Sequence, residues 1–217
     1  MKPIFERLIK KGAEAEIWLG SWLGLRVVVK RRVPKRYRRP DFDILLRRTR
    51  TLREASLIMS ARRCGVPTPA LYLVDLKATS LVMEYVPGLT IKQLLNEARL
   101  DDLMEIFRDI GTSIARLHAE GIVHGDLTTS NLILSGGRVF FVDFGLGDFN
   151  KSYEAMGVDL HLMLRALESA QPSSAHRLFS SLMEGYRRVM GPSAQLVESR
   201  VKMIRSRGRY VEARKSC

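Results

Sequence analysis

The stretch that decides the fold is His124-Gly125-Asp126-Leu127-Thr128-Thr129-Ser130-Asn131, followed by Asp143-Phe144-Gly145. Asp126 and Asn131 lie five residues apart, and Asp143 comes twelve residues after Asn131. This order is typical of phosphoryl transfer, in which the first Asp accepts a proton while the Asn and the second Asp hold Mg²⁺. Mg²⁺ prefers oxygen ligands and keeps several waters, so a carboxylate, an amide carbonyl and the phosphates of ATP suffice. Each motif alone fits an ordinary loop, but together they predict ATP and Mg²⁺ binding, with Asp126 catalytic and Asn131 and Asp143 as metal ligands.

A second pair of residues lies upstream, at a spacing that the same chemistry uses. Val27-Val28-Val29-Lys30 ends a predicted strand, and a predicted helix carries Glu54 a further 24 residues along. In such enzymes the strand Lys contacts the phosphates and the helix Glu holds that Lys by an ion pair. An exposed Lys and a solvated Glu are the ordinary alternative in an Arg-rich stretch, but the motifs of the second half favour Lys30 and Glu54 as site residues.

The loop that would cover the phosphates lies between the first two predicted strands. It carries only Gly12 rather than a glycine-rich motif, but its small neighbours would let backbone N–H groups approach a phosphate. We expect the nucleotide to contact this segment, which consists of Lys10, Lys11, Gly12, Ala13, Glu14, Ala15, Glu16 and Ile17. The backbone of Glu84 and Val86, in the segment that joins the two halves of the chain, is expected to contact adenine, from chain order alone.

Apolar periodicity divides the chain into a β-rich and an α-rich half. The first half has one long helical pattern, from Asp41 to about Arg63, and five β-branched or aromatic runs: Phe5–Ile9, Glu16–Leu19, Leu25–Lys30, Leu71–Val74 and Leu81–Tyr85. The second half contains an amphipathic helix, a hairpin and three further helical segments: 102–120, 132–142, 158–170, 173–190 and 193–206. The pattern predicts an α+β fold with a β-rich part, residues 1–86, and a helical part, residues 87–217, which together form one domain.

The composition is that of a globular protein with a large positive charge. The 217 residues are 46% hydrophobic and 27% charged, which excludes disordered and collagen-like chains. The formal net charge of +13 indicates an anionic partner, although an Arg-rich genome or a thermophilic source would explain part of it. The chain has two Cys, no long apolar run, and charges where a signal peptide would be apolar. We therefore expect a cytoplasmic protein without a disulfide framework or a membrane segment.

These motifs resemble a eukaryotic-type protein kinase reduced to its minimum, and several strings are similar to one branch of that family. The strings are Gly12–Ala15, Lys35–Pro40, Arg48-Thr49 with Arg53–Ala55, Gly65–Pro69 and His124–Leu132. They are similar to the small kinase/ATPase subunit of the KEOPS complex, the PRPK family, and the similarity runs over nearly the whole chain. The resemblance implies a minimal two-lobed kinase fold, ATP and Mg²⁺ binding, and association with the KEOPS tRNA-modifying catalytic subunit and a small regulatory subunit. It also implies support of threonylcarbamoyladenosine (t6A) formation on tRNA.

The resemblance gives the five site residues the roles stated above and adds Asp159. This residue looks like the helix Asp that holds the backbone of the catalytic loop in kinases, and an ordinary Asp at a helix N-terminus is the alternative. Three features depart from the wider kinase pattern. The catalytic motif reads His-Gly-Asp, Thr128 stands where many kinases place a Lys, and only thirteen residues separate Gly145 from Asp159. We therefore expect restricted protein phosphorylation, with ATP hydrolysis as a serious alternative output.

The positive charge is concentrated in two stretches. Residues 26–53 contain twelve Lys or Arg and two acidic residues, and residues 198–217 contain seven and two. A solvated helix face is the ordinary explanation of such a run. The tail at 205–210 also combines Arg with a Gly for flexibility and a Tyr for stacking, so we expect tRNA to contact the basic N-terminal part and this tail.

Two further function classes remain open at this point. A small-molecule phosphotransferase of the aminoglycoside-kinase type also uses His-Gly-Asp before an Asn and a later Asp, but only 72 residues follow Gly145, too few for its usual substrate region. The second class is a nucleotide-binding scaffold without turnover. Such a scaffold would have no chemical need for the full set of site residues, which are Lys30, Glu54, Asp126, Asn131 and Asp143.

Overall fold

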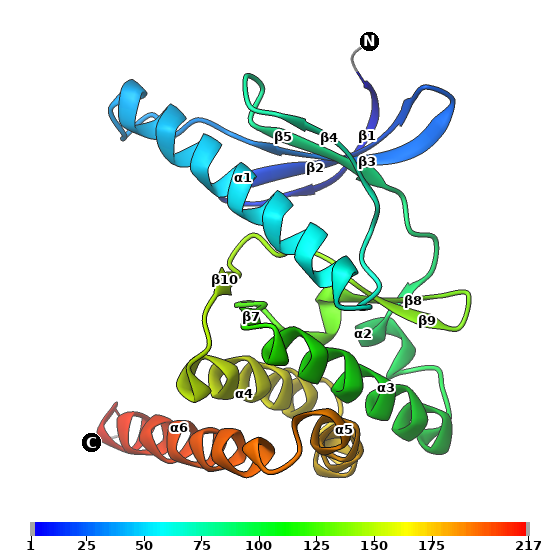
Figure 1. Cartoon of the computed structure of the whole chain (residues 1–217), viewed down its shortest axis with the longest axis vertical. Coiled ribbons are helices and arrows are strands. Elements are labelled where there is room, and N and C mark those ends of the chain that lie inside the picture. Colours follow the sequence, from blue (N-terminus) through cyan, green and yellow to red (C-terminus); the bar gives the residue numbers. More distant parts are fainter. Residues whose placement is uncertain (1–2, 216–217) are drawn as a thin grey trace.

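The computed structural model describes residues 3–215, with side chains described as far as residue 207. A five-stranded antiparallel sheet forms the upper part of the molecule in Figure 1, in the order β1-β2-β3-β5-β4. The strands are β1 (Ile4–Lys11), β2 (Ala15–Trp22), β3 (Leu25–Arg32), β4 (Leu71–Asp75) and β5 (Ser80–Glu84). Leu23 and Gly24, both at positive φ, make the tight turn between β2 and β3. All five predicted runs therefore form strands, with ends that differ by a few residues.

Helix α1 (Pro40–Arg63) crosses one face of this sheet and reaches down to the helical part of the chain (Figure 1). Pro40 begins the helix with its φ preset, acidic residues occupy the first turn, and two Arg occupy the last, so both ends suit the helix dipole. One face of α1 is buried and includes Glu54, Leu57 and Ile58. This packing places Glu54 at the inner surface of the sheet.

The second half of the chain is mainly helical, as the sequence predicts. Its longer helices are α3 (Leu100–Ala119), α4 (Tyr153–Ala170), α5 (Ala175–Met190) and α6 (Ser193–Lys215). The smaller elements are β6 (Leu89–Thr90), α2 (Ile91–Leu94), β7 (Ile122–Val123), the 3₁₀ turn η1 (Thr129–Asn131), β8 (Leu132–Ser135), β9 (Arg138–Phe141) and β10 (Asp148–Phe149). Helix α4 begins five residues before the expected position, because the Ser152 hydroxyl accepts the Ala155 N–H and caps it.

Helices α3 and α5 approach closely at two glycines. A Cβ on Gly111 would lie 1.8 Å from the Leu182 carbonyl oxygen, and one on Gly185 would lie 1.9 Å from the Arg108 carbonyl oxygen. Only glycine allows the two backbones to come this near. The contact fixes α3, and with it the start of the loop that holds Asp126.

A single large core connects the two halves. It includes Leu57 and Ile58 of α1, Phe107 of α3 and Phe144 of the loop after β9. A smaller cluster around Val27 covers the opposite face of the sheet. The predicted α+β fold, with a β-rich first part and a helical second part, is confirmed, and the exact division at residue 86 stays a prediction. Among residues 3–215, no helix is long and apolar enough to cross a membrane.

Candidate active site

Lys30 lies at the centre of the candidate site, on the middle strand of the sheet. Its ammonium donates to Glu54 Oε1 of α1 and to Asp143 Oδ1 of the loop after β9, both at 2.6 Å. Alternation along β3 directs Lys30 away from Val27 and Val29, which pack on the opposite face. Burial alone would lower the pKa of Lys30, but Glu54 and Asp143 raise it above its ordinary value. Lys30 is therefore a charged group held between two carboxylates.

Glu54 is shared by two cations from the same strand. Its Oε2 accepts from Arg32 Nη2 at 2.6 Å, while Oε1 accepts from Lys30. Glu54 is only 2% exposed, and Arg32 is 6% exposed. Because a buried carboxylate needs a partner at both oxygens, Arg32 completes the set of donors around Glu54 beside Lys30. Arg32 was not among the residues predicted from the sequence, although its position two residues after Lys30 puts it on the same face of β3.

Asp126 and Asn131 lie in the loop of residues 124–131, which we call the catalytic loop for its predicted role, and their side chains are in direct contact. The Asn131 amide nitrogen donates to the backbone oxygen and to Oδ2 of Asp126, both at 2.9 Å. These two bonds fix the orientation of the Asn131 amide, so its side-chain oxygen faces away from Asp126. Asp126 keeps one carboxylate oxygen that accepts no hydrogen bond from Asn131. The two residues predicted from spacing alone thus form one unit.

Asp159 holds the backbone at the start of this loop. Its Oδ2 accepts the His124 N–H at 2.6 Å, and its Oδ1 accepts the Gly125 N–H at 2.8 Å. Asp159 lies in the second turn of α4, so the helix N-terminal alternative does not apply. Gly125 has φ +77°, and a Cβ there would lie 2.1 Å from the Leu146 carbonyl oxygen. Glycine between His and Asp is therefore required by the close approach of this neighbouring chain.

His124 is a fully buried neutral link between the two motifs. Its Nε2–H donates to the Val142 carbonyl at 3.1 Å, and its Nδ1 accepts the Asp126 N–H at 3.4 Å. Burial lowers the pKa of His124, in spite of the nearby carboxylates. The ring packs on Phe144 with 4.7 Å between centroids. The imidazole thus ties the catalytic loop to the Asp-Phe-Gly segment without carrying charge.

Asp143 adopts a strained backbone conformation that aims its side chain at Lys30. Its φ of +66° lies in the left-handed region, which Asp tolerates better than most residues. Burial would raise the pKa of the carboxyl, but the Lys30 ammonium outweighs burial and lowers it below its ordinary value. Asp143 is therefore ionised, and its side chain keeps 30% exposure toward the cavity described next.

A cavity of about 310 Å³ lies between the sheet and the helical part. Mostly apolar side chains form its walls, including Ile17 and Val28 from above and Ile133 from below. Eight of the predicted site residues line it: Lys10, Ile17, Lys30, Glu54, Glu84, Val86, Asn131 and Asp143. An apolar slot that ends in charged groups has the form of a site for a small molecule or cofactor.

A second cavity of about 220 Å³ lies under the turn between β1 and β2. The predicted site residues around it are Lys10, Gly12, Ala13, Glu14, Ala15, Ile17, Lys30, Asp126 and Asp143. Lys11 and Glu16 line neither of the two cavities. The Glu16 carboxylate instead accepts from Trp18 and Arg31. The structure thus brings most of the predicted phosphate loop, but not these two side chains, next to Asp126.

The segment after β5 forms the wall of the larger cavity at Glu84, Tyr85 and Val86. The Glu84 N–H donates to the Ala70 carbonyl at 2.8 Å, and the Glu84 carboxylate accepts the Ala70 N–H at 2.9 Å. A contact between adenine and the backbone of Glu84 would therefore use its carbonyl oxygen. The adenine contacts predicted for Glu84 and Val86 stay predictions.

The donor set suits Mg²⁺ held jointly by protein and phosphates. Within residues 3–207, no group of three or more His, Cys, Asp or Glu could hold a metal by itself. Asp143 supplies a partly exposed carboxylate, and the Asn131 side-chain oxygen stays available because only its amide nitrogen is used in the two bonds to Asp126. Two hard oxygens of this kind match an ion that keeps waters and takes its remaining ligands from phosphate.

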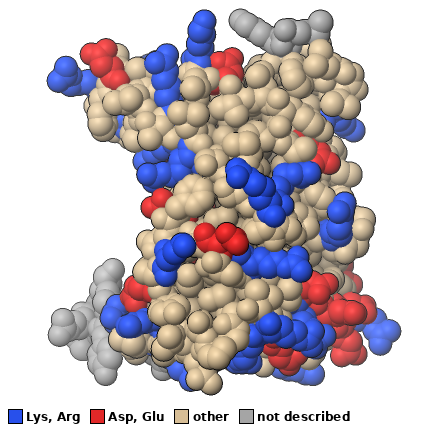
Figure 2. Space-filling view, in the orientation of Figure 1, with Lys and Arg blue, Asp and Glu red and all other residues tan. Residues whose placement is uncertain are grey.

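The basic stretch at residues 26–53 is largely engaged in contacts within the protein. Arg38 and Arg47 pair with Asp43, and Arg50 pairs with Glu14. Figure 2 shows the Lys and Arg side chains of one face, with acidic side chains beside many of them. Part of the positive charge that was predicted to bind an anionic partner is therefore used in ion pairs within the protein.

The second basic stretch lies in α6. Arg205 bonds to Glu168 at 2.8 Å, and Arg207 bonds to Glu154 at 3.0 Å. Gly208 lies inside this helix rather than in a flexible tail. The side chains of Arg209 and Tyr210 lie outside the described residues.

The fold and site have clear relatives. A model of the protein kinase domain family matches residues 23–163. The KEOPS complex subunit Bud32 of Pyrococcus abyssi is 43% identical over 213 residues, which cover 95% of this chain and 97% of the relative. A probable serine/threonine-protein kinase BUD32 homolog of Archaeoglobus fulgidus is 42% identical and is covered over 95% of its length, against 93% of this chain.

Other matches are longer or more distant. A probable bifunctional tRNA threonylcarbamoyladenosine biosynthesis protein of Methanothermobacter thermautotrophicus is 42% identical over 94% of this chain, which spans only 37% of that relative. Among solved structures, WaaP in complex with acyl carrier protein has a TM-score of 0.65 at 12% identity, with 94% of this chain and 89% of that chain covered, so this likeness shows the fold alone. The family expected from the sequence strings is confirmed: the chain belongs to the protein kinase family and, within it, to the family of Bud32.

Proposed function

We propose that the protein is a Mg²⁺- and ATP-dependent serine/threonine kinase with ATPase activity that works as a subunit of a KEOPS complex. The observation that carries the proposal is the contact of Lys30 with both Glu54 and Asp143, beside the paired Asp126 and Asn131. These five residues come from four separate segments, and they meet at the junction of two adjacent cavities. Phosphoryl transfer relies chiefly on positioning and on charge stabilisation, which this arrangement offers.

ATP fits with its adenine in the larger cavity and its phosphates toward the smaller one. Apolar side chains such as Val28 and Ile133 would sandwich the base, and Glu84 and Val86 would offer backbone groups to its edge. Lys30 would hold the phosphates, since its charge is fixed by Glu54 and Asp143. Asn131 and Asp143 would hold Mg²⁺, which neutralises phosphate charge when it is bound.

Asp126 would orient the attacking hydroxyl and accept its proton. One of its oxygens is fixed by Asn131, so the other can face an acceptor in the smaller cavity. That acceptor is a serine or threonine hydroxyl in the kinase reaction and water in the ATPase reaction. The short segment between Gly145 and Asp159 supports the second output, because it leaves little chain to bind a protein substrate.

The names of the relatives support the proposed partners. The Pyrococcus abyssi relative is named as a KEOPS complex subunit, and the longer relative, of which this chain spans 37%, is named as a probable bifunctional tRNA threonylcarbamoyladenosine biosynthesis protein. We therefore propose that the chain acts in the cytoplasm with the tRNA-modifying catalytic subunit and a small regulatory subunit, in support of t6A formation. The relatives support this proposal rather than an aminoglycoside-type phosphotransferase.

Contact with tRNA is proposed at α6 and at exposed cations that pair with no acidic side chain among residues 3–207, such as Arg36 and Arg39. Backbone phosphate contacts make binding salt-dependent. Deletion of residues 205–217 should weaken tRNA binding and flatten its dependence on salt. Unchanged affinity and an unchanged salt slope would remove the tail from the proposal.

The test of the reaction follows γ-labelled phosphate from Mg-ATP, for the wild type and Asp143→Ala, alone and with partner subunit and tRNA. Label on protein that the variant fails to transfer supports the kinase. Label released as free phosphate, chiefly with partner and tRNA present, supports the ATPase. Equal behaviour of wild type and variant under every condition contradicts both and leaves a scaffold.

A further inference from the structure

Four cations line the smaller cavity, and they differ in how firmly they are held. Lys30 and Arg32 are buried and bound to carboxylates, as described above. Lys10 lies on the edge strand β1. Arg50, one helical turn before Glu54 on α1, reaches the cavity with a side chain that is 38% exposed. Of the two arginines at this cavity, Arg50 is thus more exposed than Arg32 and less tightly held by buried carboxylates.

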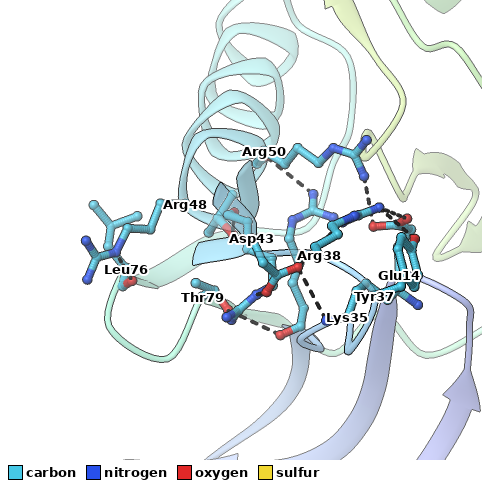
Figure 3. Close-up of polar contacts among 12 residues, drawn as sticks. Glu14, Lys35, Tyr37, Arg38, Asp43, Arg48, Arg50, Leu76 and Thr79 are labelled. Atoms are coloured by element: carbon cyan, nitrogen blue, oxygen red, sulfur yellow. Dashed lines mark hydrogen bonds and ion pairs between the residues drawn. The ribbon is translucent and has the colours of Figure 1, made fainter. Parts of the chain in front are cut away.

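Arg50 is held by a single acidic residue at the cavity edge. Its Nη1 donates to Glu14 Oε2 at 2.8 Å, while Arg38 approaches the other oxygen of Glu14 at 3.3 Å (Figure 3). Glu14 itself is 41% exposed on the turn between β1 and β2. The Arg50 backbone carbonyl accepts from Arg32, which fixes where the side chain begins. A guanidinium has five donors, so an Arg50 bound to Glu14 keeps donors for a second anion.

The catalytic loop lacks a cation of its own. Residues 127–130 read Leu-Thr-Thr-Ser, so no Lys or Arg stands between Asp126 and Asn131. The outermost phosphate of ATP would have to enter the cavity that Asp126 and Asp143 share, where both carboxylates repel it. Lys30 is already divided between two carboxylates. The remaining positive charge on the wall of this cavity comes mainly from α1 and β1.

We propose that Arg50 is a catalytic residue that contacts the terminal phosphate of bound Mg-ATP and stabilises the negative charge on it during transfer. This inference rests on the proposed ATP site. Glu14 accepts from one nitrogen of the guanidinium, and the phosphate would bind the donors that remain. Since the terminal phosphate distinguishes ATP from ADP, Arg50 also makes the site prefer ATP.

The proposal predicts a selective loss of affinity. Arg50→Gln should weaken Mg-ATP binding about tenfold or more, the size expected for one hydrogen bond between charged groups, and leave Mg-ADP binding within about twofold. Arg50→Lys keeps the charge without the planar fork, so its affinity for Mg-ATP should lie between those of the wild type and Arg50→Gln. Glu14→Gln releases the guanidinium and should leave the preference for ATP intact or increase it.

The measurement is the dissociation constant of Mg-ATP and of Mg-ADP by calorimetry for the wild type and each variant. Arg108→Gln is the matched control, because Arg108 on α3 pairs with exposed Glu184 at 3.1 Å in the same manner, away from both cavities. Circular dichroism checks that each variant is folded. A reduced ATP/ADP preference in Arg50→Gln, with no reduction in Glu14→Gln or Arg108→Gln, supports the inference.

Two results would overturn it. Equal weakening of both nucleotides in Arg50→Gln would mean that Arg50 merely supports the fold of the site. The same loss in Glu14→Gln as in Arg50→Gln would mean that Arg50 acts only by pinning the β1–β2 turn. Failure of the wild type to bind either nucleotide is a different outcome, which would contradict the proposed function itself.

Discussion

Replacement of Asp159 should destabilise the protein by an amount that its contacts define. The carboxylate is 1% exposed and accepts the N–H groups of His124 and Gly125 at 2.6 and 2.8 Å. A hydrogen bond to a charged group contributes about 1.5–3 kcal/mol, so loss of both in Asp159→Ala should cost about 3–6 kcal/mol. The total stability of a domain is about 5–15 kcal/mol, so this variant should be close to unfolding. Asp159→Asn keeps one acceptor oxygen, so it should lower the free energy of unfolding by about half as much as Asp159→Ala does.

Urea unfolding followed by circular dichroism measures these differences. The exposed Asp109 on α3 provides a control, since Asp109→Asn should change stability by less than about 0.5 kcal/mol. A free energy of unfolding for Asp159→Ala within about 1 kcal/mol of the wild type would refute the reasoning, because two buried N–H groups would then have lost their acceptor at almost no cost.

Three further predictions concern packing and charge. Gly185→Ala should lower Tm and cost about 1–3 kcal/mol, because the new Cβ would lie 1.9 Å from the Arg108 oxygen, and an unchanged Tm would contradict the close approach of α3 and α5. Tyr186→Phe should cost about 1–3 kcal/mol, because it removes the buried hydroxyl 2.9 Å from His118 Nδ1; equal Tm values would show that this contact contributes nothing. The folded pKa of Asp143 is lowered, so the stability that its charge contributes is present above the ordinary Asp pKa and is lost as the pH falls through the folded value. The stability difference between wild type and Asp143→Asn should therefore shrink on acidification, and a pH-independent difference would argue against it.

The elements and the central site residues were predictable because their signals are local. Strand runs, the helix of Glu54 and the spacing from Asp126 to Asn131 are all visible within short windows of sequence. The order of the motifs then limited the fold to one known family. The structure brings Lys30 to Glu54 as expected, and it also brings Lys30 to Asp143, a contact that the sequence did not predict.

The features that could not be predicted from the sequence depend on contacts between distant segments. In the sequence, Arg32 and Arg50 look like two more cations of a basic stretch. Only the folded chain shows that Arg32 bonds to Glu54 and that Arg50 bonds to Glu14. The requirement for glycine at position 125 comes from the Leu146 carbonyl, which spacing cannot reveal. Several arginines of residues 26–53 likewise turned out to pair within the protein, because their acidic partners lie on other elements.

Lys30, Asn131 and Asp143 are proposed to form a site for ATP with Mg²⁺. The most direct test is the affinity of ATP for the wild type with Mg²⁺ and with the metal chelated, compared with Asp143→Asn under both conditions. We expect Mg²⁺ to strengthen ATP binding to the wild type about tenfold or more, and we expect Asp143→Asn to lose most of this gain. An ATP affinity that is the same with and without Mg²⁺, or a gain that survives in the variant, would contradict it.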